Sequence, residues 1–184
     1  MRTERADMKT HEFTIIASGL DPHADDFEDR LYEAGCSDAT ISFQRGAIII
    51  AFAREAKDFA HAVVSALEDV RKAGAKIERL EPDTLVTLTD IAERTGLSKA
   101  AISLYGKGER GKAFPAPIAR VTSDSPLWDW VDISRWMYTQ QRLPLEAVLE
   151  ARTVREASAW VRAEKTNPHL LAKQLEQALA EETA

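Results

Sequence analysis

The sequence predicts an α+β protein in which a region of alternating strands and helices precedes a mostly helical one. Three observations support this class. Between residues 13 and 80, the patterns follow the order strand, helix, strand, strand, helix, strand. Between residues 87 and 137, two short helical patterns flank a Thr-Gly-Leu turn. From residue 144 onward, apolar residues recur only at helical spacing.

The first region contains six expected elements, which are bounded by glycine, proline and polar turn residues. They are a strand at 13–18, a helix at 21–34, strands at 39–44 and 47–53, a helix at 58–73 and a strand at 76–80. This order is that of a ferredoxin-like βαββαβ domain. We therefore expect such a domain at 12–81, after a flexible tail at 1–11.

The second region has the spacing of a helix-turn-helix. Ala92, Gly96 and Ile102 lie four and six residues apart. A small residue on the first helix lets the second helix approach, and a glycine permits the left-handed turn conformation. A β-branched residue on the second helix fills the space between the two. We expect this helix-turn-helix within a domain at 84–142.

Two hydroxyl side chains are placed to cap these helices. Thr89 precedes an acidic first turn, and Ser98 precedes a helix that we expect to run from Lys99 to about Tyr105. Ile102 and Tyr105 are expected to face inward. The outward positions carry lysine and serine, which suit phosphates and base edges, and an alanine, which suits a thymine methyl group. They are Lys99, Ala100, Ser103 and Lys107.

The charge distribution favours a nucleic-acid partner for this region alone. Residues 1–83 hold 11 Lys and Arg against 17 Asp and Glu, so they account for the whole net charge of −6. Between Gly96 and Val121 the only acidic residue is Glu109. The basic residues there are Lys99, Lys107, Arg110, Lys112 and Arg120. We expect them to neutralise DNA phosphates.

Beyond the second helix, the pattern is that of a β-wing. A basic glycine-rich loop at 106–112 is expected to be flexible and to lie near DNA phosphates. Short strand-like stretches at 118–121 and 127–130 then flank a polar turn. A helix beginning at Val131 follows, and its Trp136 is expected to close the core.

These residues together resemble a known family over about 87–137. The matching segments are Leu88-Thr89-Asp90-Ile91-Ala92, Thr95-Gly96-Leu97-Ser98, Phe114-Pro115-Ala116-Pro117, Trp128 and Ile133-Ser134-Arg135-Trp136. The chain is similar there to the winged helix-turn-helix proteins of the MerR-like superfamily, most closely the AlpA/excisionase branch. The loop at 106–112 is longer than is usual in that family, and Asp124 stands at the wing tip.

The resemblance implies DNA binding in which the second helix enters the major groove and the wing touches the backbone or the neighbouring minor groove. It places four residues in the groove, Ser98, Lys99, Ala100 and Ser103. It places three on the wing, Arg120, Thr122 and Ser123. The expected function is that of a sequence-specific transcriptional regulator of double-stranded DNA. The alternative for the helix pair itself is a helical hairpin used only for protein contacts.

Two other motifs have alternative interpretations. The segment from Gly106 to Lys112 nearly matches a phosphate-binding loop, but Ala113 replaces the Ser or Thr that would hold Mg²⁺. The acidic cluster around His23 suggests a metal site, although a solvated acidic helix start is the simpler interpretation. We therefore expect no metal, no cofactor and no catalytic residues, and a chain that is not an enzyme.

The C-terminal part, 144–184, is expected to form two helices, at 146–165 and 169–180, that dimerise the chain. The alternative is that they pack on their own subunit. A second functional hypothesis is an autoregulating antitoxin or a ligand-sensing regulator, in which the N-terminal domain binds a partner protein or a small molecule. An adjacent toxin-like reading frame would favour the antitoxin.

Composition predicts a cytoplasmic protein. Cys36 is the only cysteine, so no internal disulfide forms. The charged N-terminus does not match a secretory signal, and the longest apolar run, 47–53, is far too short for a membrane span.

Overall fold

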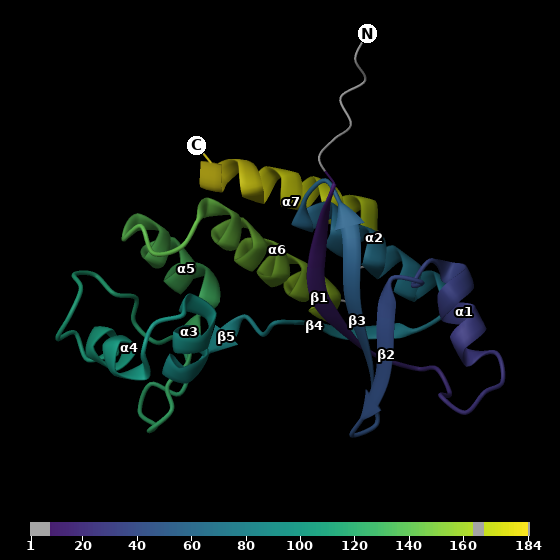
Figure 1. Cartoon of the computed structure of the whole chain (residues 1–184), viewed down its shortest axis with the longest axis horizontal. Helices are drawn as coiled ribbons and strands as arrows, with labels where there is room; N and C mark the ends of the chain where they lie inside the picture. The colour runs from purple at the N-terminus through teal and green to yellow at the C-terminus, as the bar shows by residue number, and fades with distance from the viewer. Residues whose placement is uncertain (1–7, 164–167, 184) are drawn as a thin grey trace, which may run out of the picture. The chain divides into compact units, whose positions relative to one another are not determined.

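The computed structural model describes residues 8–163 and 168–183, and it shows a mixed α/β protein (Figure 1). The described residues contain one four-stranded antiparallel sheet, one two-stranded sheet and seven helices. The chain divides into two compact units. We call Met1–Pro82 with Glu156–Ala184 the sheet unit, and Asp83–Arg155 the helical unit. No helix among the described residues is long and apolar enough to cross a membrane.

The sheet unit is built around four strands in the order β2-β3-β1-β4. Helices α1 and α2 lie on one face of this sheet, where Phe27 of α1 contacts Phe43 and Phe59 of α2 contacts Phe13. The elements are β1 (Lys9–Ser18), α1 (Phe27–Ala34), β2 (Ala39–Gln44), β3 (Ala47–Ala56), α2 (Phe59–Lys72) and β4 (Lys76–Glu81).

The first strand and the first helix of this unit start at other residues than expected. The expected tail at 1–11 is wrong for its last residues, because β1 starts at Lys9 and His11 is buried. The helix expected from Asp21 starts only at Phe27, because the Asp21 carboxylate accepts the N–H of His23 and holds a local turn. Residues 1–7 lie outside the described part.

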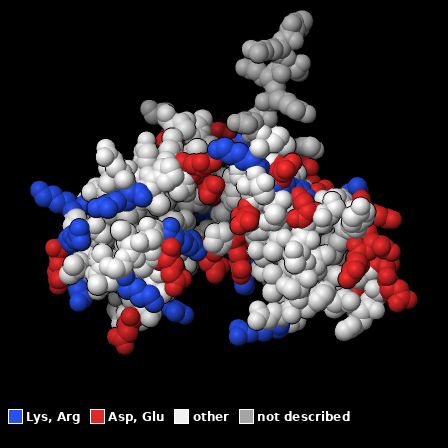
Figure 2. All heavy atoms as spheres, viewed as in Figure 1, with Lys and Arg blue, Asp and Glu red and all other residues white. Residues whose placement is uncertain are grey.

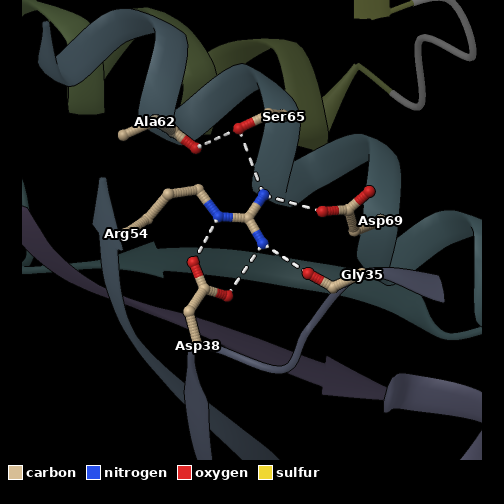
Figure 3. A network of polar contacts seen from close by, with 6 residues as sticks. All are labelled: Gly35, Asp38, Arg54, Ala62, Ser65 and Asp69. Carbon is tan, nitrogen blue, oxygen red and sulfur yellow. Dashed lines mark hydrogen bonds and ion pairs between the residues drawn. The ribbon is translucent and has the colours of Figure 1, made fainter. Parts of the chain in front are cut away.

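Strand β3 continues three residues beyond the expected 47–53, and this extension buries an arginine. Ile48, Ile50 and Phe52 face the core at alternate positions, so the strand period brings Arg54 to the same face. The Arg54 guanidinium donates to both carboxylate oxygens of Asp38, at 2.8 and 2.9 Å, and to Asp69 at 2.7 Å. It also donates to the Gly35 carbonyl and the Ser65 hydroxyl (Figure 3). Every N–H direction of the buried cation is thereby used.

The C-terminal helices are α6 (Leu145–Arg162) and α7 (Pro168–Thr183), and the last two residues of the helix expected at 146–165 lie outside the described residues. Helix α7 packs against α2. Leu171 and Leu175 are buried within the chain, as the own-subunit alternative would have it. Trp160 of α6 is buried beside Arg71, whose guanidinium carbon lies 4.1 Å from the ring centroid. Dimerisation through these helices stays a prediction.

The helical unit contains the predicted helix-turn-helix segment. Its elements are β5 (Leu85–Val86), α3 (Leu88–Thr95), α4 (Lys99–Gly106), β6 (Trp128–Asp129), α5 (Trp130–Thr139) and the N-terminal part of α6. The wing strands expected at 118–121 and 127–130 are wrong. Only an isolated bridge joins Ala119 to Leu127, because β6 pairs instead with β5 and Asp129 already caps α5 by accepting the N–H of Val131.

Candidate nucleic-acid interface

The pair α3 and α4 is joined as the spacing predicted. Ala92 and Ile102 are buried in the same cluster, and Gly96 has the left-handed φ of 67° that ends α3. The expected cap at Thr89 is wrong, because Thr87 caps the helix. The Thr87 hydroxyl accepts the N–H of Asp90, and the Asp90 carboxylate accepts the N–H and the O–H of Thr87. The pKa of Asp90 is lowered mainly by the hydrogen bond from the Thr87 N–H, and further by the one from the Thr87 O–H.

An aromatic and aliphatic cluster packs against the buried sides of the two helices. Tyr105 of α4 contacts Trp136 of α5 edge-on and stacks on Phe114, with ring centroids 5.1 and 5.8 Å away. The buried members are Val86, Ile91, Ala92, Ile102, Tyr105, Trp128, Ile133, Trp136 and Met137. Because α4 buries only Ile102 and Tyr105 in this cluster, its opposite side faces outward.

The outward side of α4 carries the residues predicted to enter a groove. Ser98, Lys99 and Ala100 are exposed, whereas Ser103 is half-buried. Ser98 caps the helix by accepting the N–H of Ala101 at 3.2 Å. That bond uses an acceptor site of the hydroxyl, so its O–H can donate to a phosphate. The N-terminal end of α4 therefore offers an exposed hydroxyl and an exposed ammonium at consecutive positions.

The glycine-rich loop 106–112 is fastened by hydrogen bonds, and its expected flexibility stays a prediction. The N–H groups of Glu109 and Arg110 both donate to the Leu104 carbonyl. The indole N–H of Trp136 donates to the Lys112 carbonyl at 3.0 Å. A Cβ on Gly111 would lie 2.9 Å from side-chain atoms of both Tyr105 and Trp136, so the chain passes directly over the aromatic cluster.

This fastened loop holds its three cations at the surface. Lys107, Arg110 and Lys112 are exposed, and the Arg110 guanidinium carbon lies 5.5 Å from the Tyr105 ring centroid. A pocket of about 580 Å³ opens here, with Lys107 and Lys112 on its lining and no carboxylate among its lining residues, all of which are described. A pocket lined by lysines and aromatic rings suits an anionic group such as a backbone phosphate.

The segment predicted to be a wing forms a tight turn instead of a pair of strands. Arg120, Thr122 and Ser123 are exposed as predicted, and Arg120 has a left-handed φ of 52°. The Ser123 N–H and hydroxyl both donate to the Arg120 carbonyl at 2.9 Å. Ser123 therefore holds the turn in shape, and its hydroxyl proton is already committed. Arg120 and Thr122 are exposed on this turn, as is Asp124.

Sequence reasoning missed the two indole groups that anchor the segment before the wing. Besides the bond from Trp136, the Trp128 indole N–H donates to the Pro115 carbonyl at 2.9 Å. The Trp136 ring was correctly expected in the core, but no sequence signal links either tryptophan to a carbonyl 13 or 24 residues away. The carbonyl partners follow only from the tertiary arrangement.

Figure 2 shows Lys and Arg side chains projecting over the α3–α4 region with some acidic side chains among them, while acidic side chains gather near α1. The charge asymmetry of the sequence is thus visible on the surface.

Within the described residues, no group of three or more His, Cys, Asp or Glu has a geometry that would hold a metal. No family model, curated protein or solved structure matches the chain.

Proposed function

We propose that the protein is a DNA-binding transcriptional regulator that inserts α4 into the major groove. The single observation that carries this proposal is the α3–Gly96–α4 geometry. The two helices share one buried cluster, and the outer side of α4 is left exposed with Ser98 and Lys99 at its start. A helix of this diameter fits the major groove of B-DNA.

The cations divide into three places around α4. Lys99 lies in its first turn, Lys107, Arg110 and Lys112 lie on the fastened loop after it, and Arg120 lies on the wing turn. In the proposal, these five neutralise phosphates on either side of the groove, while Ser98, Ala100 and Ser103 face the bases. Because Arg, Asn and Gln are missing from that face, base discrimination relies on DNA shape as much as on hydrogen bonds.

In this proposal the sheet unit is a ferredoxin-like domain. Its strand order β2-β3-β1-β4, with α1 and α2 on one face, supports that assignment. The helical unit is then a winged helix-turn-helix domain with a reduced wing, akin to the AlpA/excisionase branch. The protein acts as a cytoplasmic homodimer by occupying DNA, with no chemistry on it. A second half-site supplies the specificity that one small unit lacks.

The first test is retention of fragmented genomic DNA by the purified protein, followed by sequencing and by light scattering. We expect a dimer that enriches one inverted-repeat site. Titrations of that site over a range of salt concentrations then define the interface. Lys99→Ala and Arg120→Ala should each weaken binding and flatten the salt slope by about one unit.

Lys72→Ala is the matched control, since Lys72 is an exposed lysine at the end of α2 in the sheet unit. It should leave both affinity and slope unchanged. Failure to retain DNA at low salt would overturn the proposed function. Retention with unchanged salt slopes in both interface variants would overturn the proposed face.

A further inference from the structure

A cavity of about 330 Å³ opens between α2 and α7 within the sheet unit. Its walls are mostly aliphatic, formed by Ala60 and Val64 of α2 and by Ala172, Leu175 and Leu179 of α7. The cavity is open to solvent on one side, where His61, His169 and Glu176 are exposed. A gap of this volume lies at the lower end of the range of small-ligand sites.

The charged groups on the cavity are all carboxylates or histidines. Asp58, Glu68 and Glu176 line it, and no Lys or Arg is among its lining residues, all of which lie in the described part. Asp58 is already engaged, since it accepts the N–H of His61 at 2.9 Å and contacts the His61 ring nitrogen at 2.7 Å. The carboxylates that remain for a ligand are those of Glu68 and Glu176, one on each helix.

The other polar side chain of α2 on the wall is committed to the fold. The Ser65 hydroxyl donates to the Ala62 carbonyl and accepts from Arg54, which joins the cavity wall to the buried arginine network. A ligand therefore meets an aliphatic wall, two carboxylates on facing helices and the imidazole rings of His61 and His169. An anion would be repelled, and a neutral alkyl group would leave the carboxylates without a counter-charge.

We propose that this cavity binds a small organic ammonium ion whose alkyl body lies on Val64, Leu175 and Leu179. The ammonium group donates to Glu68 and Glu176, in charge-assisted hydrogen bonds that a neutral head group makes less strongly. The proposal rests on the sheet unit alone. It holds or fails independently of DNA binding by the helical unit.

The test is calorimetric titration of the full chain with three probes of equal length, namely hexylammonium, 1-hexanol and hexanoate. We expect hexylammonium to bind about tenfold more tightly than hexanol, as one charge-assisted interaction provides, and hexanoate to bind most weakly. The double variant Glu68→Gln with Glu176→Gln keeps side-chain size and should reduce the preference for hexylammonium over hexanol to less than about threefold.

Two further variants separate charge from shape. The matched control is Glu28→Gln with Glu33→Gln, which removes two exposed carboxylates from α1 of the same unit and should preserve the preference. Ala172→Leu fills the cavity and should weaken hexylammonium and hexanol alike by about tenfold. Circular dichroism confirms that each variant is folded.

Several results would overturn the proposal. Equal affinity for hexylammonium and hexanol would show an apolar groove without charge selection, and tighter binding of hexanoate would show the wrong sign. Absence of saturable binding would show that there is no site. A protein dimer that Ala172→Leu dissociates would show that a second copy occupies this face.

Discussion

Arg54 of the sheet unit and the arginines around α4 of the helical unit lie in opposite environments. In the sheet unit, the Arg54 side chain is 8% exposed and bonds to two carboxylates, a carbonyl and a hydroxyl (Figure 3). In the helical unit, Arg110 and Arg120 are exposed, as are Lys99, Lys107 and Lys112. A buried cation has to be paired within the chain, whereas an exposed one remains available to a partner. Arg54 therefore serves the fold, whereas the exposed cations around α4 remain available to the proposed DNA partner.

The largest effect should come from removing the buried cation. Arg54→Ala leaves Asp38 and Asp69 without their counter-charge beside the core, so we expect the free energy of unfolding to fall by about 3 kcal/mol. Urea unfolding followed by circular dichroism measures it. The matched control is Arg79→Ala, because Arg79 pairs with Glu81 at 2.8 Å in a solvent-exposed position. That change should cost less than about 1 kcal/mol. Equal losses would remove the contrast between the two kinds of arginine.

The next effect concerns the loop that carries three of the cations. Gly111→Ala adds a Cβ at 2.9 Å from Tyr105 and Trp136 at a φ of 73°, so it should cost about 2–3 kcal/mol. Gly108 has the same φ but open space around it. Gly108→Ala should therefore cost only about 1 kcal/mol. The same urea titrations compare the two, and equal costs would mean that the loop is not fastened to the aromatic cluster.

Part of this contrast was predictable and part was not. The order of elements and the burial of Ala92 and Ile102 followed from periodicity, because local spacing decides which face of a helix is apolar. The burial of Arg54 also had a signal, since it continues the alternation of Ile48 and Phe52, but the strand was expected to end at Ala53. Its partner Asp38 lies in the loop before β2, and its partner Asp69 lies in α2. No local sequence pattern predicts these two contacts.

The helical unit shows the same division. The exposure of Lys99 and Arg120 followed from the helix and wing patterns, while the wing strands did not form. Leu127 is followed by Trp128, which pairs with Val86 of β5, a residue more than forty positions away in the sequence. Thr87 was missed as the cap in favour of Thr89 because both are threonines ahead of acidic residues. Only the backbone geometry distinguishes between them.

A smaller effect tests how the N-terminal end of α3 is held. The pKa of Asp90 lies below its ordinary value, because the N–H and O–H of Thr87 bond to its carboxylate. Its stabilising contribution is therefore complete above the ordinary pKa and is lost as the pH falls through the depressed pKa of the folded state. Asp90→Ala should cost about 1 kcal/mol at pH 7 and progressively less below about pH 4.

Unfolding experiments at pH 7 and at pH 3 measure this change. Asp132→Ala is the comparison, since Asp132 lies in the first turn of α5 and pairs with Arg135 at 3.3 Å on the surface. It should cost less than about 0.5 kcal/mol at either pH. A loss at Asp90 that persists unchanged at pH 3 would contradict the carboxylate as its source.

The smallest expected change in stability is also the most informative about function. Lys99 and Arg120 are exposed, so replacing both with alanine should change the free energy of unfolding by less than about 0.5 kcal/mol. The same double variant should lower DNA affinity and flatten the salt slope by about two units. Stability and binding would then be separable on this surface, as they cannot be at Arg54. A double variant that unfolds easily would mean that these side chains hold the fold, and the proposed difference between the two units would disappear.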